Sequence, residues 1–126
     1  MEHKYTNYVK KDKIDICIKK MKGFEFRTYL KIPLINKSEK KMIIIMMNPS
    51  KANKDDSDIT VNKVLEYANK NELYNEVIIL NVISLYESSS NKIKKVRNDF
   101  IQCHSKEKFE ELMKINFNKI KSTVEN

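Results

Sequence analysis

Glycine is almost absent from this chain of 126 residues, which has a single one, Gly23. The glycine-rich loop that binds dinucleotides and the phosphate-binding P-loop each need several glycines at fixed spacing, so both are excluded. The chain also has no G-x-S-x-G, H-E-x-x-H or C-x-x-C pattern. It therefore lacks the short signatures of several hydrolases, zinc proteases and cysteine metal sites.

Cysteine, histidine and long apolar runs are also scarce. Cys17 and Cys103 lie among apolar residues, and we interpret both as reduced core thiols of a cytosolic protein. His3 and His104 are poorly spaced to complete a metal site with them, so no metal and no cofactor is expected. No apolar run approaches the ~18 residues that cross a membrane, and residues 1–13 have no signal-peptide apolar region. We expect a cytoplasmic protein that does not contact a membrane.

Arginine is rare although the chain is basic. The formal net charge is +8, and only Arg27 and Arg97 are arginines. A basic excess favours polyanionic partners, whereas scattered lysines also form an ordinary solvated surface. Because arginine is the better residue for bidentate contacts to bases and phosphates, its scarcity argues against sequence-specific DNA recognition.

The N-terminal third alternates apolar and polar residues. One run is centred on Ile16, and a second follows Lys22-Gly23. Period two in both runs predicts an antiparallel hairpin over about residues 13–32 with one buried face. That face is expected to hold Phe24, Phe26, Thr28, Leu30 and Ile32, with Glu25, Arg27, Tyr29 and Lys31 on the other. Residues 1–12 are expected to be flexible or peripheral.

Six apolar residues run without interruption from Met42 to Met47, directly before Asn48-Pro49-Ser50. Such a run predicts a strand buried on both faces, which is typical of a central strand in a parallel sheet. Pro49 cannot donate to a ladder and disfavours helical geometry at Asn48, so the strand should end there. Asn48 is thereby expected at the carboxyl end of a central strand, where open α/β sheets bind ligands.

A helix and a second apolar strand are expected next. Ser57 or Asp58 can cap the helix, whose apolar face is made by Val61, Val64, Leu65 and Ala68. A strand then runs from Val77 to about Ile83. This order predicts a βαβ unit with two adjacent parallel strands. Asn48, Asp58, Thr60 and Asn81 then gather at one edge of the sheet as candidate ligand-binding residues.

Two C-terminal helices complete the expected fold. The first carries Ile93, Val96, Phe100 and Cys103 on one side, and the second covers about residues 105–123. Its apolar face is expected to hold Phe109, Leu112, Met113, Asn116, Phe117 and Ile120, opposite a lysine face. We predict the α/β class in a single domain over residues 1–126, with a βαβ core of two parallel central strands, the N-terminal hairpin and C-terminal helices.

The motif Asn48-Pro49-Ser50 with Ala52 after an apolar strand resembles the opening of a bacterial and phage family of unassigned role, domain-of-unknown-function family 1643. Further matches to its pattern are Asp58 with Thr60, Leu80-Asn81-Val82 and Asn98-Asp99. The resemblance covers about residues 24–101. It implies that Ser50, Tyr86, Ser88, Asn98 and Asp99 also contribute to ligand binding.

The later part of the chain departs from the family pattern. Tyr86 stands where the family tends to have Arg, and Ser88 and Ser90 stand where it has Thr and Pro. The family continues into a strand with a Trp-Gly motif and a His-Pro segment, whereas this chain has no Trp and ends in a lysine-rich stretch. It resembles a shortened member that lacks part of the sheet.

The same motifs are distantly similar to the uracil-DNA glycosylase superfamily, in which an Asn at a strand end positions a water against a sugar carbon. This similarity implies Asn48 as a catalytic candidate. The donor to the leaving base has no counterpart, because His104 follows too closely on the preceding helix to take that role. An intact glycosylase is not expected, and whether the protein is an enzyme stays open.

Each candidate residue also has a purely structural interpretation. Asn48 can close a turn before proline, Asp58 and Thr60 can start a helix, and Asn81 can be satisfied within the sheet end. Tyr86 can be a packing residue, and Asn98 and Asp99 can be exposed helix positions.

Three functions therefore compete. The first is binding of a nucleotide or nucleic-acid component at the strand ends, with or without a degenerate glycosylase-like activity. The second is a non-enzymatic phage or bacterial interaction protein that binds a protein partner or forms a homodimer through an exposed sheet edge. The third is general polyanion binding through lysines, which predicts a steep fall of affinity with salt.

Overall fold

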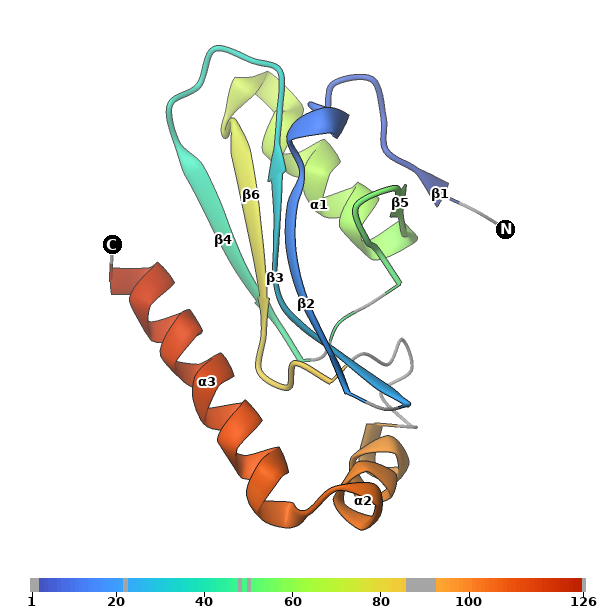
Figure 1. Ribbon diagram of the computed structural model, residues 1–126. Coiled ribbons are helices and arrows are strands. Elements are labelled where there is room, and N and C mark those ends of the chain that lie inside the picture. Colours follow the sequence, from blue (N-terminus) through green and yellow to red (C-terminus); the bar gives the residue numbers. More distant parts are fainter. Residues whose placement is uncertain (1–2, 22, 48, 50, 86–92, 126) are drawn as a thin grey trace.

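The computed structural model describes residues 3–21, 23–47, 49, 51–85 and 93–125. Its strands are β1 (His3–Lys4), β2 (Asp15–Met21), β3 (Phe24–Pro33), β4 (Lys41–Met46), β5 (Asp56–Ser57) and β6 (Glu76–Asn81). Its α-helices are α1 (Ile59–Asn69), α2 (Ile93–Cys103) and α3 (Lys106–Glu125), and two short 3-10 helices are η1 (Lys11–Lys13) and η2 (Lys70–Glu72). The protein thus has a mixed α/β fold, as the sequence predicts (Figure 1).

Four strands form the main sheet in the order β2-β3-β6-β4. β2 and β3 form the expected antiparallel hairpin, which turns at Gly23 with φ of 80°. β3 pairs antiparallel with β6, and β6 pairs in parallel with β4. The connection from β4 through α1 to β6 confirms the predicted βαβ unit, and its two strands are adjacent as expected.

The position of β4 differs from the prediction. Of the two parallel strands only β6 is central, while β4 is the last strand in the order. Ile43, Ile45 and Met47 are 38%, 49% and 60% exposed, so β4 is not buried on both faces. The apolar composition of β4 correctly predicts a β-strand. The number of strands that pair with it depends on tertiary contacts, which composition does not encode.

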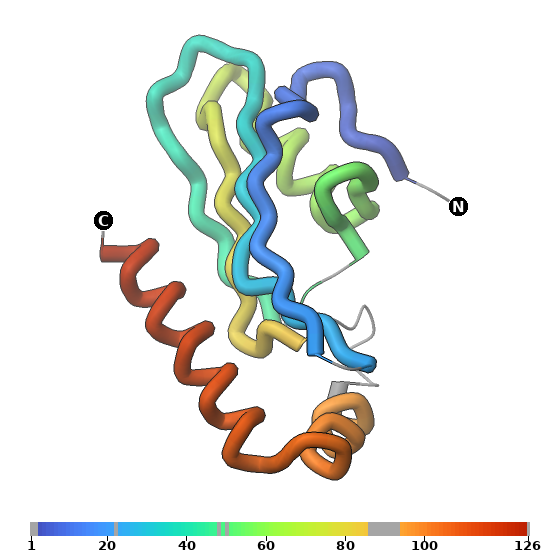
Figure 2. The backbone as a smooth tube through the Cα atoms, in the orientation of Figure 1, coloured from blue at the N-terminus to red at the C-terminus, as the bar shows by residue number. Residues whose placement is uncertain are grey.

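The main core lies between the sheet and α1. The sheet contributes Leu30, Ile32, Val77 and Ile79, and α1 contributes Val61, Leu65 and Ala68. The helix face is the one that the sequence predicts. Tyr5 and Val9, in the segment expected to be flexible or peripheral, are also buried in this core. The tube in Figure 2 shows how this N-terminal segment passes beside α1.

A second apolar cluster joins the hairpin end to α2 and α3. Its buried members are Phe26, Leu85, Phe100, Phe109 and Leu112. The ring of Phe100 meets the rings of Phe24 and Phe26 edge-on, with centroids 5.1 and 5.2 Å apart. Such edge-to-face pairs contribute about 0.5–1.5 kcal/mol beyond the area that they bury. α2 and α3 are therefore anchored at one end of the sheet.

Two expectations are wrong, one about the buried face of α3 and one about the two cysteines. Phe117 is 63% exposed, because Asn116 rather than Phe117 faces the sheet and donates hydrogen bonds to its backbone. Cys103 is exposed at the end of α2 and Cys17 is half-buried, so neither is a core thiol, although both are free. A one-residue change in helix phase turns a side chain by about 100°, which sequence periodicity does not resolve at the edge of an apolar face.

Two kinds of feature are absent from the described residues. No helix among them combines the length and apolar character needed to span a membrane. Within the same part of the chain, no three His, Cys, Asp or Glu side chains come together in a way that could hold a metal ion.

The central position of β6 can be tested by truncating its side chains. Ile79 is fully buried, whereas Ile59 at the start of α1 is 57% exposed. We expect Ile79→Ala to lower the free energy of unfolding by about 2–5 kcal/mol, because it removes buried methyl groups and leaves a cavity. Ile59→Ala is the matched control, and its effect should stay within about 0.5 kcal/mol. Urea denaturation measures both, and equal effects would contradict the assigned core.

Candidate functional site

The carboxyl ends of β4 and β6 lie level with each other. Met46 pairs with Asn81 in the parallel register. Beyond the strands, the Val82 amide donates to the Met46 carbonyl at 2.7 Å and the Ile83 amide donates to the Met47 carbonyl at 2.8 Å. These bonds hold the two strand ends side by side. This is the edge of an α/β sheet where ligands bind in general.

Several predicted site residues fall outside the described part of the chain. These are Asn48, Ser50, Tyr86 and Ser88. The structure does describe residues close to them in the sequence, namely Met47, Ala52 and Leu85.

Asn81 is the last residue of β6 and is fully buried. Alternation along the strand turns it to the same face as Val77 and Ile79, which is the face that α1 covers. Among the described residues, neither its side-chain nitrogen nor its side-chain oxygen has a hydrogen-bond partner. A buried polar group in that state costs about 1–3 kcal/mol. The interpretation of Asn81 as a residue satisfied within the sheet end is therefore not supported.

Asp58 starts α1 and also holds the loop before it. One carboxylate oxygen accepts the amide of Val61 at 2.8 Å, which confirms the predicted helix cap. The other oxygen accepts the amide of Ala52 at 2.9 Å. Both oxygens of Asp58 therefore bind backbone amides, and the carboxylate joins the loop after β4 to the first turn of α1.

Arg27 is a functional candidate that sequence reasoning missed. Its side chain is fully buried, and its Nη1 donates to the Ala52 carbonyl at 2.7 Å. Ala52 thus binds Arg27 through its carbonyl and Asp58 through its amide. This arrangement places a guanidinium on the α1 side of the sheet, close to the strand ends. The available signal was its residue type, because nearly all other basic residues are lysines.

A β-bulge explains why alternation placed Arg27 on the wrong face. Cys17 pairs with Tyr29, but the next residue, Ile18, pairs with Arg27. Thr28 is therefore an extra residue in β3, and it reverses the alternation between Leu30 and Arg27. Bulges re-aim side chains in this way and are common next to functional sites. The prediction that Thr28 shares the buried face with Leu30 is wrong for the same reason.

The loop between Ala52 and α1 is fixed by its own turn and by the N-terminus. The side-chain oxygen of Asn53 accepts the amides of Asp55 and Asp56 at 2.9 and 2.7 Å. The Tyr5 hydroxyl donates to the Asn53 carbonyl at 2.6 Å, and Lys4 forms an ion pair with Asp56 at 2.6 Å. The strand pair β1–β5 adds backbone pairing between the same segments. The loop between Ala52 and α1 is thus fixed by three sets of contacts.

The remaining predicted residues lie elsewhere. Thr60 is exposed on the first turn of α1, and Asn98 is exposed on α2. Asp99 is half-buried on α2, where its carboxylate lies 3.8 Å from Lys95. None of the hydrogen bonds found among the described residues joins these three to Asn81 or Asp58. Their predicted role in binding has no support from these contacts.

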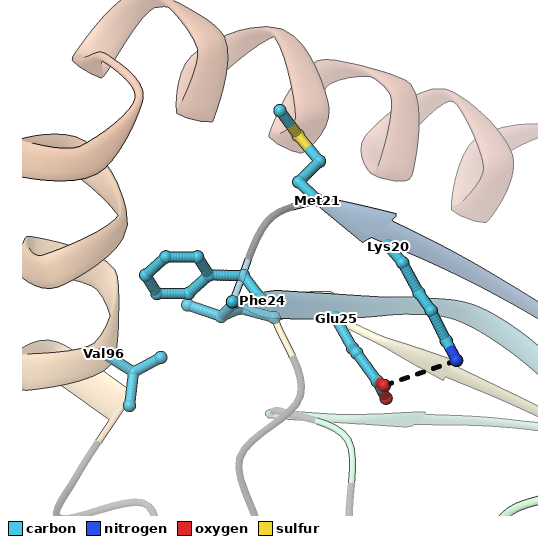
Figure 3. A pocket seen from close by; sticks show the side chains of 7 residues that line it. Lys20, Met21, Phe24, Glu25 and Val96 are labelled. Carbon is cyan, nitrogen blue, oxygen red and sulfur yellow. Dashed lines mark ion pairs between the residues drawn. The ribbon is translucent and has the colours of Figure 1, made fainter.

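A hollow of about 540 Å³ lies at the tip of the β2–β3 hairpin, at the same end of the sheet as the strand ends (Figure 3). It is lined by Lys20, Met21, Gly23, Phe24, Glu25, Leu85 and Val96. In Figure 3 the ring of Phe24 points toward Val96. Lys20 and Glu25 form an ion pair at 3.7 Å between exposed side chains, which contributes little to stability. The hollow is thus lined by both apolar and charged side chains.

A second groove of about 540 Å³ lies between the hairpin and α3, on the opposite face of the sheet from α1. Tyr29 lines it, with the ammonium groups of Lys31 and Lys119 at 4.8 and 5.0 Å from the ring centroid. Burial raises the pKa of Tyr29 above its ordinary value of 10.0, and the charge and hydrogen bond of Asp15 raise it further. Tyr29 therefore stays protonated at neutral pH and supplies a neutral hydroxyl.

The double role of Asp58 makes a graded prediction. Asp58→Ala removes the helix cap and the acceptor of the Ala52 amide, and we expect a loss of about 1–2 kcal/mol in the free energy of unfolding. Asp58→Asn keeps a single oxygen, so its loss should be about half as large. Guanidinium denaturation of the three proteins measures this order. Two variants as stable as the parent would contradict a structural role for the carboxylate.

Comparison with known proteins identifies the family. The model of the family described as protein of unknown function (DUF1643) matches residues 27–123, a span that begins at the buried arginine and ends within α3. Neither the curated proteins nor the solved structures provide a match. The distant similarity to uracil-DNA glycosylases therefore stays a prediction. Since the match covers well over half of the chain, the protein belongs to the DUF1643 family.

Proposed function

We propose that the protein binds a nucleotide or a nucleic-acid component at the carboxyl ends of β4 and β6. The observation that carries the proposal is the buried amide of Asn81, whose nitrogen and oxygen have no partner among the described residues. Buried polar atoms in folded proteins nearly always have hydrogen-bond partners, and exceptions call for an explanation. A ligand that offers a donor and an acceptor side by side would supply the missing partners and so explain the exception.

The chemistry of an asparagine amide favours a nucleobase as that ligand. The amide presents two N–H donors and one carbonyl acceptor in a plane. This pattern matches the edge of adenine, where Asn pairs with the N6 donor and the N7 acceptor. The hollow at the hairpin tip, lined in part by Phe24 and Val96, lies at the same end of the sheet as this amide. The amide of Asn81 is fully buried, and a hydrogen bond is stronger in such an environment than in water.

The charge of the protein supports an anionic ligand. The guanidinium of Arg27 lies on the α1 side of the sheet near the strand ends, and the whole chain carries a formal net charge of +8. A field of this sign attracts phosphates and raises their local concentration. We therefore expect nucleotides to bind more tightly than free bases. General polyanion binding, in contrast, would give nucleotides the same affinity whichever base they carry.

The proposal is limited to binding. Asn48, the one catalytic candidate that the distant similarity to uracil-DNA glycosylases implies, lies outside the described residues. Each carboxylate oxygen of Asp58 accepts a backbone amide, and these contacts stabilise the loop after β4 and the start of α1. A degenerate glycosylase-like activity stays a separate hypothesis, which release of free base from single-stranded DNA would test.

Replacing Asn81 separates binding from stability. Asn81→Leu keeps the branched shape and the number of side-chain heavy atoms but removes the buried amide, so we expect the ligand-free variant to be more stable by about 1–3 kcal/mol. The same variant should lose the thermal stabilisation that a bound nucleoside monophosphate gives the parent protein, since ligands stabilise only the state that binds them. Thermal unfolding with each of the common nucleoside monophosphates and with short single-stranded DNA measures both effects.

Asn98→Leu is the matched control, because Asn98 is an exposed asparagine on α2. It should leave the ligand-induced shift unchanged. The proposal fails if no nucleotide or single strand stabilises the parent more than Asn81→Leu. A less stable Asn81→Leu protein would show that the amide serves the fold.

A further inference from the structure

β4 leaves one side of its backbone without a partner strand. Among the described residues it pairs only with β6, and no strand follows it in the sheet. The Val82 amide donates to the Met46 carbonyl, so the backbone groups of Met46 face β6. Alternation then directs those of Ile44 and Met42 to β6 as well, and those of Ile43 and Ile45 away from it. The outer edge of β4 therefore presents the N–H and C=O groups of Ile43 and Ile45.

This edge lacks the features that keep natural edge strands apart. Edge strands usually carry lysine, proline or a bulge, or are very short. From Met42 to Met47 the chain has no charge and no proline, and its register with β6 is regular. Ile43, Ile45 and Met47 are exposed on one face of this strand. An open, apolar and regular edge is a template for another strand.

We propose that β4 pairs with β4 of a second copy of this chain, antiparallel and about a two-fold axis at Ile44, to form a homodimer. The apolar run reads almost the same in both directions around this residue, as Met42, Ile43, Ile44, Ile45 and Met46. In this register Ile43 lies opposite Ile45 of the second copy, and Met42 lies opposite Met46. Cross-strand pairs of this kind are the unit of stabilisation in an antiparallel sheet.

The directions of the backbone groups fit the same register. In an antiparallel ladder, pairs that exchange two hydrogen bonds alternate with pairs that exchange none. The backbone groups of Ile43 and Ile45 point outward. Ile43 therefore exchanges two hydrogen bonds with Ile45 of the second copy, and Ile45 exchanges two with Ile43 of the second copy. Ile44 points its groups to β6 and meets its own symmetry mate in a non-hydrogen-bonded pair. A shift by one residue would place inward-facing groups opposite outward-facing ones.

The charges along the edge also permit a second copy. Lys41 is the only charged residue of β4, and it lies opposite Met47 of the second copy in this register. No like charges within the strand face each other, although the whole chain carries +8. This overall charge repels a second copy at long range, so dimers should become more abundant as salt screens it.

α3 lies close enough to widen the contact. Ile43 and Ile78 line a hollow of about 310 Å³ together with Thr123 of α3. Val124, the next residue of α3, and Phe117 are both exposed. Figure 1 shows the C-terminal end of α3 beside β4. The end of α3 thus carries an exposed apolar residue, Val124, next to a residue that lines this hollow.

The mass of the protein in solution tests the proposal. At tens of micromolar protein and moderate salt, we expect light scattering to give twice the chain mass of 15.0 kDa. Ile45→Lys places a charge at the centre of the paired edge and should give the single-chain mass, with an unchanged far-ultraviolet circular dichroism spectrum. Ile59→Lys is the matched control on α1 and should stay dimeric. A parent protein of single-chain mass at every salt concentration overturns the proposal, and so does an Ile45→Lys protein that remains folded and dimeric.

A disulfide tests the register. In a Cys17→Ser, Cys103→Ser background, Ile44→Cys should form a cross-linked dimer on mild oxidation, because the Cα atoms of a non-hydrogen-bonded pair lie about 4.5 Å apart, within disulfide range. Met42→Cys in the same background should not, since it lies opposite Met46 rather than itself. Equal cross-linking of the two variants would overturn the register at Ile44. These measurements contain no nucleotide, so their failure leaves the binding proposal untouched.

Discussion

The parallel pairing of β4 with β6 is the constraint on which the rest of the structure depends. It requires a crossover, and the crossover places α1 on one face of the sheet, where the main core forms. It also brings Met46 level with Asn81, so the two strand ends and the loops after them share one edge. Because β6 takes the central place, β4 is left at the rim with its outer backbone groups unpaired by any described strand.

Polar groups in the interior concentrate at the carboxyl ends of these strands. Arg27 and Asn81 are fully buried, and Ala52 links Arg27 to Asp58 through two hydrogen bonds. Burying such groups opposes folding unless hydrogen bonds offset the loss of water. The apolar core between the sheet and α1 supplies the stability that this arrangement requires. The molecule therefore has an apolar core that stabilises the fold and, at the strand ends, buried polar groups whose desolvation opposes folding. Local departures of this kind are common at functional sites.

Much of the fold was readable from local patterns. Period two over the hairpin, helical spacing over α1 and the apolar runs of β4 and β6 each predict the element that the structure contains, because burial on one side imposes these periods directly. Asp58 was readable as a cap for the same local reason. Arg27 was not, because a single extra residue at Thr28 reverses the faces of β3. The buried state of Asn81 followed from its strand, but the lack of a partner for its amide among the described residues did not.

The sequence by itself determined which segments are strands and helices, that two apolar strands flank a helix, and that an asparagine ends the second of them. Only the tertiary structure decided which strand is central, which face Arg27 occupies and which side of α3 meets the sheet. Local periods arise from contacts between near neighbours in the chain and are written in a few residues. The order of strands, a bulge and the phase of a packed helix depend on partners that are distant in sequence, so no local pattern encodes them.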